Sequence, residues 1–162
     1  STRKESSAAS DVYKRQVVGM NCFRGPPTMF PYIKEIRKAL KCHVAALPIT
    51  YRTTEKNPTF FNLPDNNGCA CPTPHQTPFP TALDPMQVNR YEMGKFMKDC
   101  FDLGINYLGV CCGANPMLIR ETAHAVGLTV PASKYKEKMS NHFMYGKNKR
   151  ISKHMKDYGN KA

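Results

Sequence analysis

The sequence lacks any long hydrophobic run. No stretch approaches the ~18 consecutive apolar residues that a membrane-spanning helix needs. The chain also lacks the charged, apolar and small-residue order of a secretory signal at its start. We therefore expect a soluble, cytoplasmic protein with no membrane partner.

Acidic residues are scarce, with 12 Asp and Glu against 24 Lys and Arg, a formal net charge of +12. Much of this excess lies between Lys134 and Lys161, where nine basic residues face only Glu137 and Asp157. The middle of the chain is nearly balanced. Because the positive charge is concentrated at the two ends of the chain and does not form one basic binding face, we expect no nucleic-acid partner.

Cysteine, by contrast, is plentiful, with seven residues in the chain. The odd number and the lack of a signal peptide argue against a framework of disulfides. The sequence therefore predicts reduced thiols, some of them metal ligands.

Composition divides the chain into three segments. Residues 1–16 are polar and rich in Ser and Ala, without hydrophobic periodicity, and we expect a non-native or disordered leader. Residues 17–130 are predicted to form a folded domain. Residues 131–162 are basic and weakly periodic, and are predicted to be a C-terminal extension. A foreign leader running directly into a strand indicates a fragment of a longer protein.

Within 17–130, short apolar runs alternate with amphipathic segments. The runs predict buried strands at 17–22, 42–49 and 105–112, and the segments predict helices at about 29–40, 86–103 and 115–126. Asn115, Pro116 and the glycines at 104 and 127 are typical helix-end residues. This alternation predicts an α/β fold with parallel strands. The polar loop at about 50–84 is long enough to suggest a function.

Three cysteines lie where such a fold places its functional site, at the carboxyl ends of the strands. Cys22 ends the first predicted strand, and Cys111 and Cys112 end the third. Neighbouring residues in a strand point to opposite faces. Cys111 and Cys112 can therefore share one ion only if the strand has ended, and Gly113 would allow the backbone to turn there.

Three thiolates and one open position are the pattern of a catalytic zinc site. A substrate thiol at the open position would be held as its thiolate. The pattern alone leaves simple packing of the cysteines as an alternative. Cys69 and Cys71, in the long loop, fit either a second metal or redox pair or an incidental spacing.

Two motifs carry a family resemblance. The segment 18–22 (VGMNC) and the segment 109–113 (GVCCG) resemble, in the same order, two segments of the homocysteine S-methyltransferase family. The likeness spans about residues 17–133 and is nearest to the betaine–homocysteine branch. Two departures are Val110, where the family usually has Gly, and Leu47, where that branch carries Gln.

The resemblance implies that the chain is the carboxyl-terminal part, about three βα units, of a (β/α)8 TIM barrel. It implies Zn²⁺ held by Cys22, Cys111 and Cys112, with Asn21 either binding substrate or only satisfying the strand end. Homocysteine would receive a methyl group from betaine, or from a sulfonium donor such as S-methylmethionine, to give methionine. The basic extension would support a homo-oligomer of the full-length protein.

The same resemblance places part of the substrate pocket on strands that this sequence does not contain, so we expect the fragment to be inactive by itself. Two alternatives stay open. One is a non-catalytic interaction or oligomerisation fragment. The other is a basic binding protein with a structural zinc.

Overall fold

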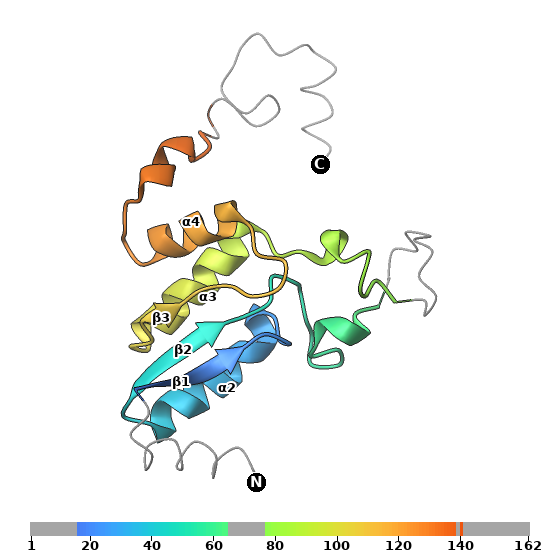
Figure 1. Ribbon diagram of the computed structural model, residues 1–162, viewed down its shortest axis with the longest axis horizontal. Helices are drawn as coiled ribbons and strands as arrows, with labels where there is room; N and C mark the ends of the chain where they lie inside the picture. Colours follow the sequence, from blue (N-terminus) through green and yellow to red (C-terminus); the bar gives the residue numbers. More distant parts are fainter. Residues whose placement is uncertain (1–15, 65–76, 139, 141–162) are drawn as a thin grey trace. The chain divides into compact units, whose positions relative to one another are not determined.

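Three parallel strands form the centre of the computed structural model, which describes residues 16–64, 77–138 and 140. The strands are β1 (Val17–Asn21), β2 (His43–Leu47) and β3 (Tyr107–Leu108), in the order β1-β2-β3. The register pairs Val17 with His43 and Ala45 with Tyr107. Helices alternate with the strands along the chain (Figure 1). The predicted parallel α/β arrangement is confirmed, and the sheet formed by the described residues is open.

The helices are α2 (Pro26–Ala39), α3 (Arg90–Asp102) and α4 (Pro116–Ala125), with 3₁₀ turns at Phe60–Asn62, Asp84–Met86 and Pro131–Tyr135. Helix α2 begins before the expected start at about residue 29. Pro26 and Pro27 occupy its first two positions, where a backbone N–H has no partner inside the helix. The two prolines therefore start the helix and do not form a loop before it.

Helix α3 begins at Arg90 and not at the expected residue 86, because Asn89 caps it. The Asn89 side chain accepts hydrogen bonds from the N–H groups of Tyr91 and Glu92, both at 2.9 Å. The Glu92 carboxylate in turn accepts from the Asn89 N–H at 2.7 Å. This reciprocal capping box satisfies the free donors of the first turn.

The helix ends follow the predicted chemistry. Asn115 caps α4 by accepting from the Leu118 N–H at 3.0 Å, and Pro116 occupies the first turn. Gly104 and Gly127 end α3 and α4 with φ of 77° and 81°. This left-handed conformation is the one that closes helices at glycine.

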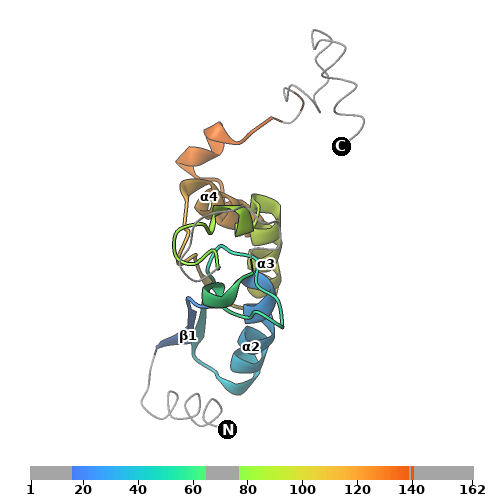
Figure 2. The same ribbon diagram turned by 90° about the vertical axis from the view of Figure 1, so that its right-hand side faces the viewer.

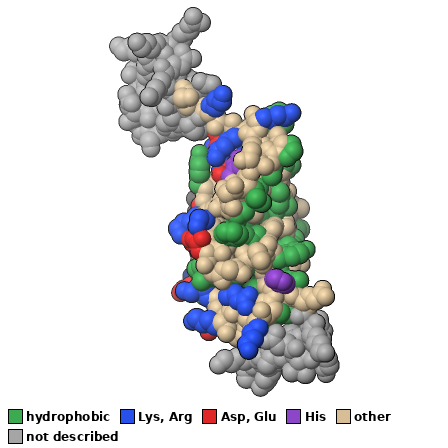
Figure 3. All heavy atoms as spheres, turned by 90° about the vertical axis from the view of Figure 1, so that its left-hand side faces the viewer, with side chains coloured by type: hydrophobic (Ala, Val, Ile, Leu, Met, Phe, Trp, Pro, Cys, Tyr) green, Lys and Arg blue, Asp and Glu red, His purple; other side chains and the backbone are tan. Residues whose placement is uncertain are grey.

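Helices α2 and α3 lie on one side of the sheet (Figure 2). The main core joins their apolar faces to Val44 and Ala46 of β2 and to Leu118 of α4. On the opposite face of the sheet, Val17 is 43% exposed and Tyr107 is 55% exposed. Figure 3 shows hydrophobic side chains at several places on one face of the molecule, with Lys and Arg gathered along one side.

Strand β3 is much shorter than the expected 105–112. The Gly109 N–H donates to the Ala46 carbonyl at 3.2 Å, and the Cys111 N–H donates to the Pro48 carbonyl at 2.8 Å. Pro48 lies between these two bonds and, as a proline, has no N–H that could donate to the neighbouring segment. The regular ladder of hydrogen bonds therefore stops there. Cys111 is consequently tied to the end of β2 while lying beyond the strand itself.

The long loop is not simply polar. Ile49, Phe60, Leu63 and Leu83 form a second buried cluster, against which these partly buried residues pack: Cys22, Tyr51, Phe79, Met86 and Cys111. The ring centroids of Phe60 and Phe79 are 5.3 Å apart in an edge-to-face contact. Hydrophobic periodicity missed this cluster because its members are scattered among Pro, Thr and Asn. Residues 65–76, with Cys69 and Cys71, lie outside the described residues.

The chain divides into two compact units, Ser1–Thr129 and Val130–Ala162. In the second, the described part contains the 3₁₀ turn Pro131–Tyr135. The leader at 1–16 and the oligomerising role of 131–162 stay predictions, because most of these residues lie outside the described ranges. None of the helices in those ranges is both long and apolar enough to span a membrane.

Candidate metal centre

Cys22 lies directly after β1, where the backbone leaves the sheet in a tight turn. The Cys22 N–H still donates to the Leu47 carbonyl at 3.0 Å. Cys22 and Phe23 then adopt φ of 70° and 63°, a conformation that costs roughly 1–2 kcal/mol per non-glycine residue. The Arg24 N–H bonds to the Cys22 carbonyl at 2.8 Å, and the Phe60 N–H bonds to the Phe23 carbonyl at 3.2 Å. These bonds hold the strained turn that presents the Cys22 thiol.

Cys111 and Cys112 occupy the first two positions of a turn that ends at Ala114. The Ala114 N–H donates to the Cys111 carbonyl at 3.1 Å, and Gly113, at the third position, has φ of 80°. A positive φ at this position is the requirement of a type II turn. The predicted strand at 105–112 is therefore wrong at its end, because β3 stops at Leu108. The condition for both thiols to share one ion is met, since the pair lies in a turn that Gly113 allows.

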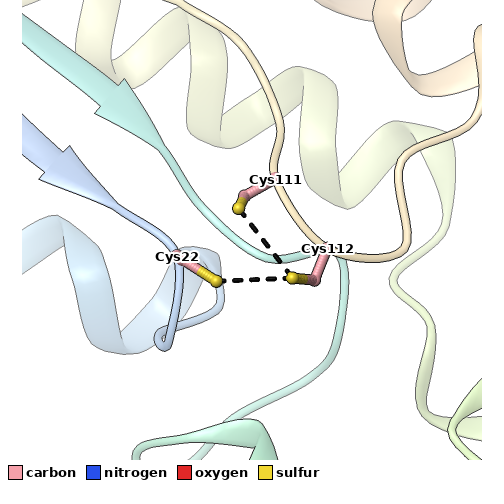
Figure 4. Close-up of side chains that lie close together, drawn as sticks. All are labelled: Cys22, Cys111 and Cys112. Carbon is pink, nitrogen blue, oxygen red and sulfur yellow. Dashed lines mark hydrogen bonds between the residues drawn. The ribbon is translucent and has the colours of Figure 1, made fainter.

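The three sulfur atoms lie together (Figure 4). The Sγ atoms of Cys22 and Cys112 are 3.4 Å apart, and those of Cys111 and Cys112 are 3.9 Å apart. All three sulfurs lie within 4.8 Å of one another. Tetrahedral zinc with Zn–S bonds of ~2.3 Å requires sulfurs separated by ~3.8 Å. The spacing of the three thiols is therefore consistent with three corners of such a site, and their role as zinc ligands stays a prediction.

The site is open on one side. Cys22 and Cys111 are half-buried against the second cluster, while Cys112 is exposed. Cys42 precedes β2, at the other end of that strand. Cys100 is buried within α3, and burial raises the pKa of its thiol to about 12. Neither joins the group of three thiols.

The thiols ionise unequally. Burial opposes ionisation of Cys22, yet hydrogen bonds from Cys111, from the Phe23 backbone and from Cys112 outweigh it and lower the pKa of Cys22. The pKa of Cys112 rises to about 12, chiefly because the neutral thiol donates to Cys22 and then because of burial. Burial and the hydrogen bond with Cys22 raise the pKa of Cys111. Without a metal, Cys22 is therefore the first thiolate to form.

We expect metal affinity to rise steeply with pH. The raised pKa values of Cys111 and Cys112 mean that both thiols carry protons at neutral pH and must release them to a metal. Each released proton changes affinity tenfold per pH unit, so proton release from these two thiols alone should raise zinc affinity about a hundredfold per unit. Competition with a chelator of known protonation between pH 6.5 and 7.5 measures the slope. An affinity that does not depend on pH would show that these thiols are not ligands.

Two residues at the site escaped the sequence analysis. Thr50 Oγ1 donates to the Cys112 carbonyl at 3.2 Å, and Gln87 Nε2 donates to the Gly113 carbonyl at 2.9 Å. Their partners lie 62 and 26 positions away in the sequence, so no local motif signals them. Asn21, the predicted substrate-binding residue, is exposed at the end of β1 beside Cys22.

Comparison with known proteins places the chain in a family. The family model for homocysteine S-methyltransferase matches residues 2–126. Betaine–homocysteine S-methyltransferase 1 of Xenopus tropicalis is 31% identical over 113 residues, covering 66% of this chain and 25% of that protein. S-methylmethionine–homocysteine S-methyltransferase of Pongo abelii is 28% identical over 127 residues, covering 72% of this chain and 31% of that protein.

The chain thus spans about a quarter of the length of the curated relatives it matches. The matched range of the family model includes the two turns that carry Cys22, Cys111 and Cys112. The chain therefore belongs to the homocysteine S-methyltransferase family.

Proposed function

We propose that this chain carries the metal centre of a zinc-dependent S-methyltransferase. The enzyme would transfer a methyl group from betaine, or from a sulfonium donor such as S-methylmethionine, to homocysteine, giving methionine. The observation that carries the proposal is the meeting of three thiols, from the ends of β1 and β3, within 4.8 Å of one another. Family membership supports homocysteine as the acceptor, and the names of the two relatives supply betaine and S-methylmethionine as donors.

The residues suit sulfur chemistry. Zinc bound by Cys22, Cys111 and Cys112 would keep an added sulfur as a thiolate near neutral pH. Three thiolate ligands withdraw less electron density from that sulfur than neutral imidazoles would, so it stays nucleophilic. Such a ligand set suits attack of sulfur on carbon better than activation of water, for which histidine ligands are common.

The exposed side of the centre gives room for the acceptor. Cys112 is exposed, and we propose that the neighbouring Asn21 amide binds a polar group of homocysteine. In the transfer, the homocysteine sulfur forms a bond to the methyl carbon. The C–N or C–S bond of the donor breaks, and its electron pair remains on the donor.

The chain would supply about three βα units of an eight-stranded barrel, with segment 131–162 supporting a homo-oligomer of the longer protein. The described sheet is open, and the relatives are about four times as long as the matched region. We therefore expect this chain to bind the metal and the acceptor thiol without catalysing the complete reaction.

Homocysteine binding to the Co²⁺-loaded chain tests the proposal. Co²⁺ reports thiolate ligands through sulfur-to-metal absorption, and a fourth thiolate should raise that absorption by about a third. We expect the rise with millimolar homocysteine and none with homoserine, in which a hydroxyl replaces the thiol. A spectrum already typical of four thiolates, and unchanged by homocysteine, would indicate a closed structural site and contradict the proposal.

A further inference from the structure

The turn that carries Cys112 is held by two side chains outside the proposed ligand set, Thr50 and Gln87, which we term the turn clamp. Thr50 bonds to the Cys112 carbonyl twice, through its N–H at 3.0 Å and through Oγ1 at 3.2 Å. Gln87 Nε2 donates to the next carbonyl, that of Gly113, at 2.9 Å. The carbonyls of Cys112 and Gly113 are thus both hydrogen-bonded to segments distant in sequence.

The bonded carbonyl of Cys112 belongs to the central peptide of the turn. Type I and type II turns differ mainly by rotation of this peptide. A carbonyl that accepts two hydrogen bonds from Thr50 resists that rotation, which would break both. The turn clamp therefore selects the backbone in which the Cys112 sulfur lies 3.4 Å from Cys22 and 3.9 Å from Cys111.

The turn clamp is itself held firmly. Thr50 is fully buried. The Val88 N–H donates to the Thr50 carbonyl and the Arg52 N–H donates to the Met86 carbonyl, both at 2.8 Å. These bonds fix the backbone on either side of Gln87. The Gln87 Nε2 also lies 3.4 Å from Thr50 Oγ1, so the two halves of the clamp contact each other.

The space around the turn is also filled. A Cβ atom on Gly113 would lie 2.1 Å from Thr50 Oγ1 and 2.8 Å from the Tyr51 ring. The hydroxyl of Thr50 thus both bonds the turn and packs against it. A change at either clamp residue would loosen the position of Cys112 without touching any sulfur atom.

We propose that Thr50 and Gln87 are positioning residues of the metal centre, which keep Cys112 in the ligand set by fixing the peptide that follows it. This inference rests on the proposed function, because it requires the three cysteines to be ligands. It assigns a role to side chains that neither contact the metal position nor belong to the two cysteine motifs.

A double variant, Thr50→Val with Gln87→Met, tests the inference with Co²⁺ as the probe. Valine keeps the shape and the N–H of Thr50 but removes Oγ1, and methionine keeps the length of Gln87 without a donor. We expect Co²⁺ affinity to fall about 10–100-fold, as for other outer-shell partners of metal sites. Thiolate-to-metal absorption should fall by about a third as Cys112 leaves the ligand set. The single variant Thr50→Ser retains the hydroxyl and leaves Gln87 unchanged. It should show native Co²⁺ affinity and native thiolate-to-metal absorption.

Thr122→Val is the matched control. Thr122 is also buried, and its Oγ1 donates to a backbone carbonyl, that of Leu118, at 2.9 Å, but inside α4. We expect this variant to lose some stability in chemical denaturation while keeping the native Co²⁺ spectrum and affinity. An equal loss of affinity in Thr122→Val would attribute the effect to general destabilisation and overturn the inference.

Native affinity and native absorption in the double variant would also overturn it, while leaving the proposed function intact. A native chain that shows no thiolate absorption with Co²⁺ would instead contradict the proposed function itself. The two failures are thus distinguished by which protein, native or variant, gives the unexpected spectrum.

Discussion

A chain with serine in place of Cys111 is expected to lose stoichiometric zinc. The Cys111 sulfur lies 3.9 Å from that of Cys112, and all three sulfurs lie within 4.8 Å of one another. Removing one thiolate takes away a direct bond to the metal. The loss of affinity should therefore exceed about a hundredfold, the upper range for loss of an outer-shell partner. Metal analysis after dialysis against a weak chelator, together with competition titration, measures the loss.

Cys42→Ser is the control for this experiment. Cys42 is half-buried and precedes β2, whereas the three proposed ligands follow the ends of β1 and β3. It should retain native zinc content and affinity. If Cys111→Ser also retained native affinity, the site of three thiolates would be wrong, and Cys111 would be explained by its packing against the second cluster.

The second large effect is expected for Gly113→Ala. Alanine at φ of 80° is strained, and its Cβ would lie 2.1 Å from Thr50 Oγ1. Strain and overpacking together should lower the free energy of unfolding by about 2–5 kcal/mol. Because relief of the overlap must move the turn or Thr50, zinc affinity should fall as well. Denaturant titration and metal competition on the same sample measure both effects.

Gly104→Ala separates strain from overlap. Gly104 has nearly the same φ, 77°, but a Cβ atom there would have nothing within 4 Å. Only the conformational cost of about 1–2 kcal/mol should appear, with metal affinity unchanged. Equal destabilisation of the two variants, with equal metal affinity, would show that the packing around Gly113 does not position the cysteine pair.

Local chemistry made several features predictable. A side-chain acceptor at Asn115 and glycines at 104 and 127 act within one turn of backbone, so their roles follow from neighbouring residues alone. The alternation of strands and helices follows in the same way from hydrophobic periodicity.

The boundaries of the helices and strands were less predictable. Helix α3 starts at Arg90 because Asn89 and Glu92 cap each other. Strand β3 stops early because Pro48, directly after β2, lacks an N–H.

The candidate ligands were also within reach of the sequence. In a parallel α/β fold the carboxyl ends of the strands lie at one edge, so the order of elements along the chain places Cys22, Cys111 and Cys112 at the same edge of the sheet. The family motifs then indicated a metal and an acceptor thiol, which the spacing of the cysteines could not.

By itself, then, the sequence determined the type and order of the main strands and helices, which thiols share an edge of the sheet and which family the motifs resemble, because these depend on local chemistry and chain order. Only the tertiary structure decided how the thiols come into contact. The left-handed turn at Cys22 and the bonded peptide after Cys112 bring the sulfurs together. Thr50 bonds a carbonyl 62 positions away, and Gln87 one 26 positions away. Such contacts form only when the chain packs, because no sequence pattern encodes the distance between groups that far apart.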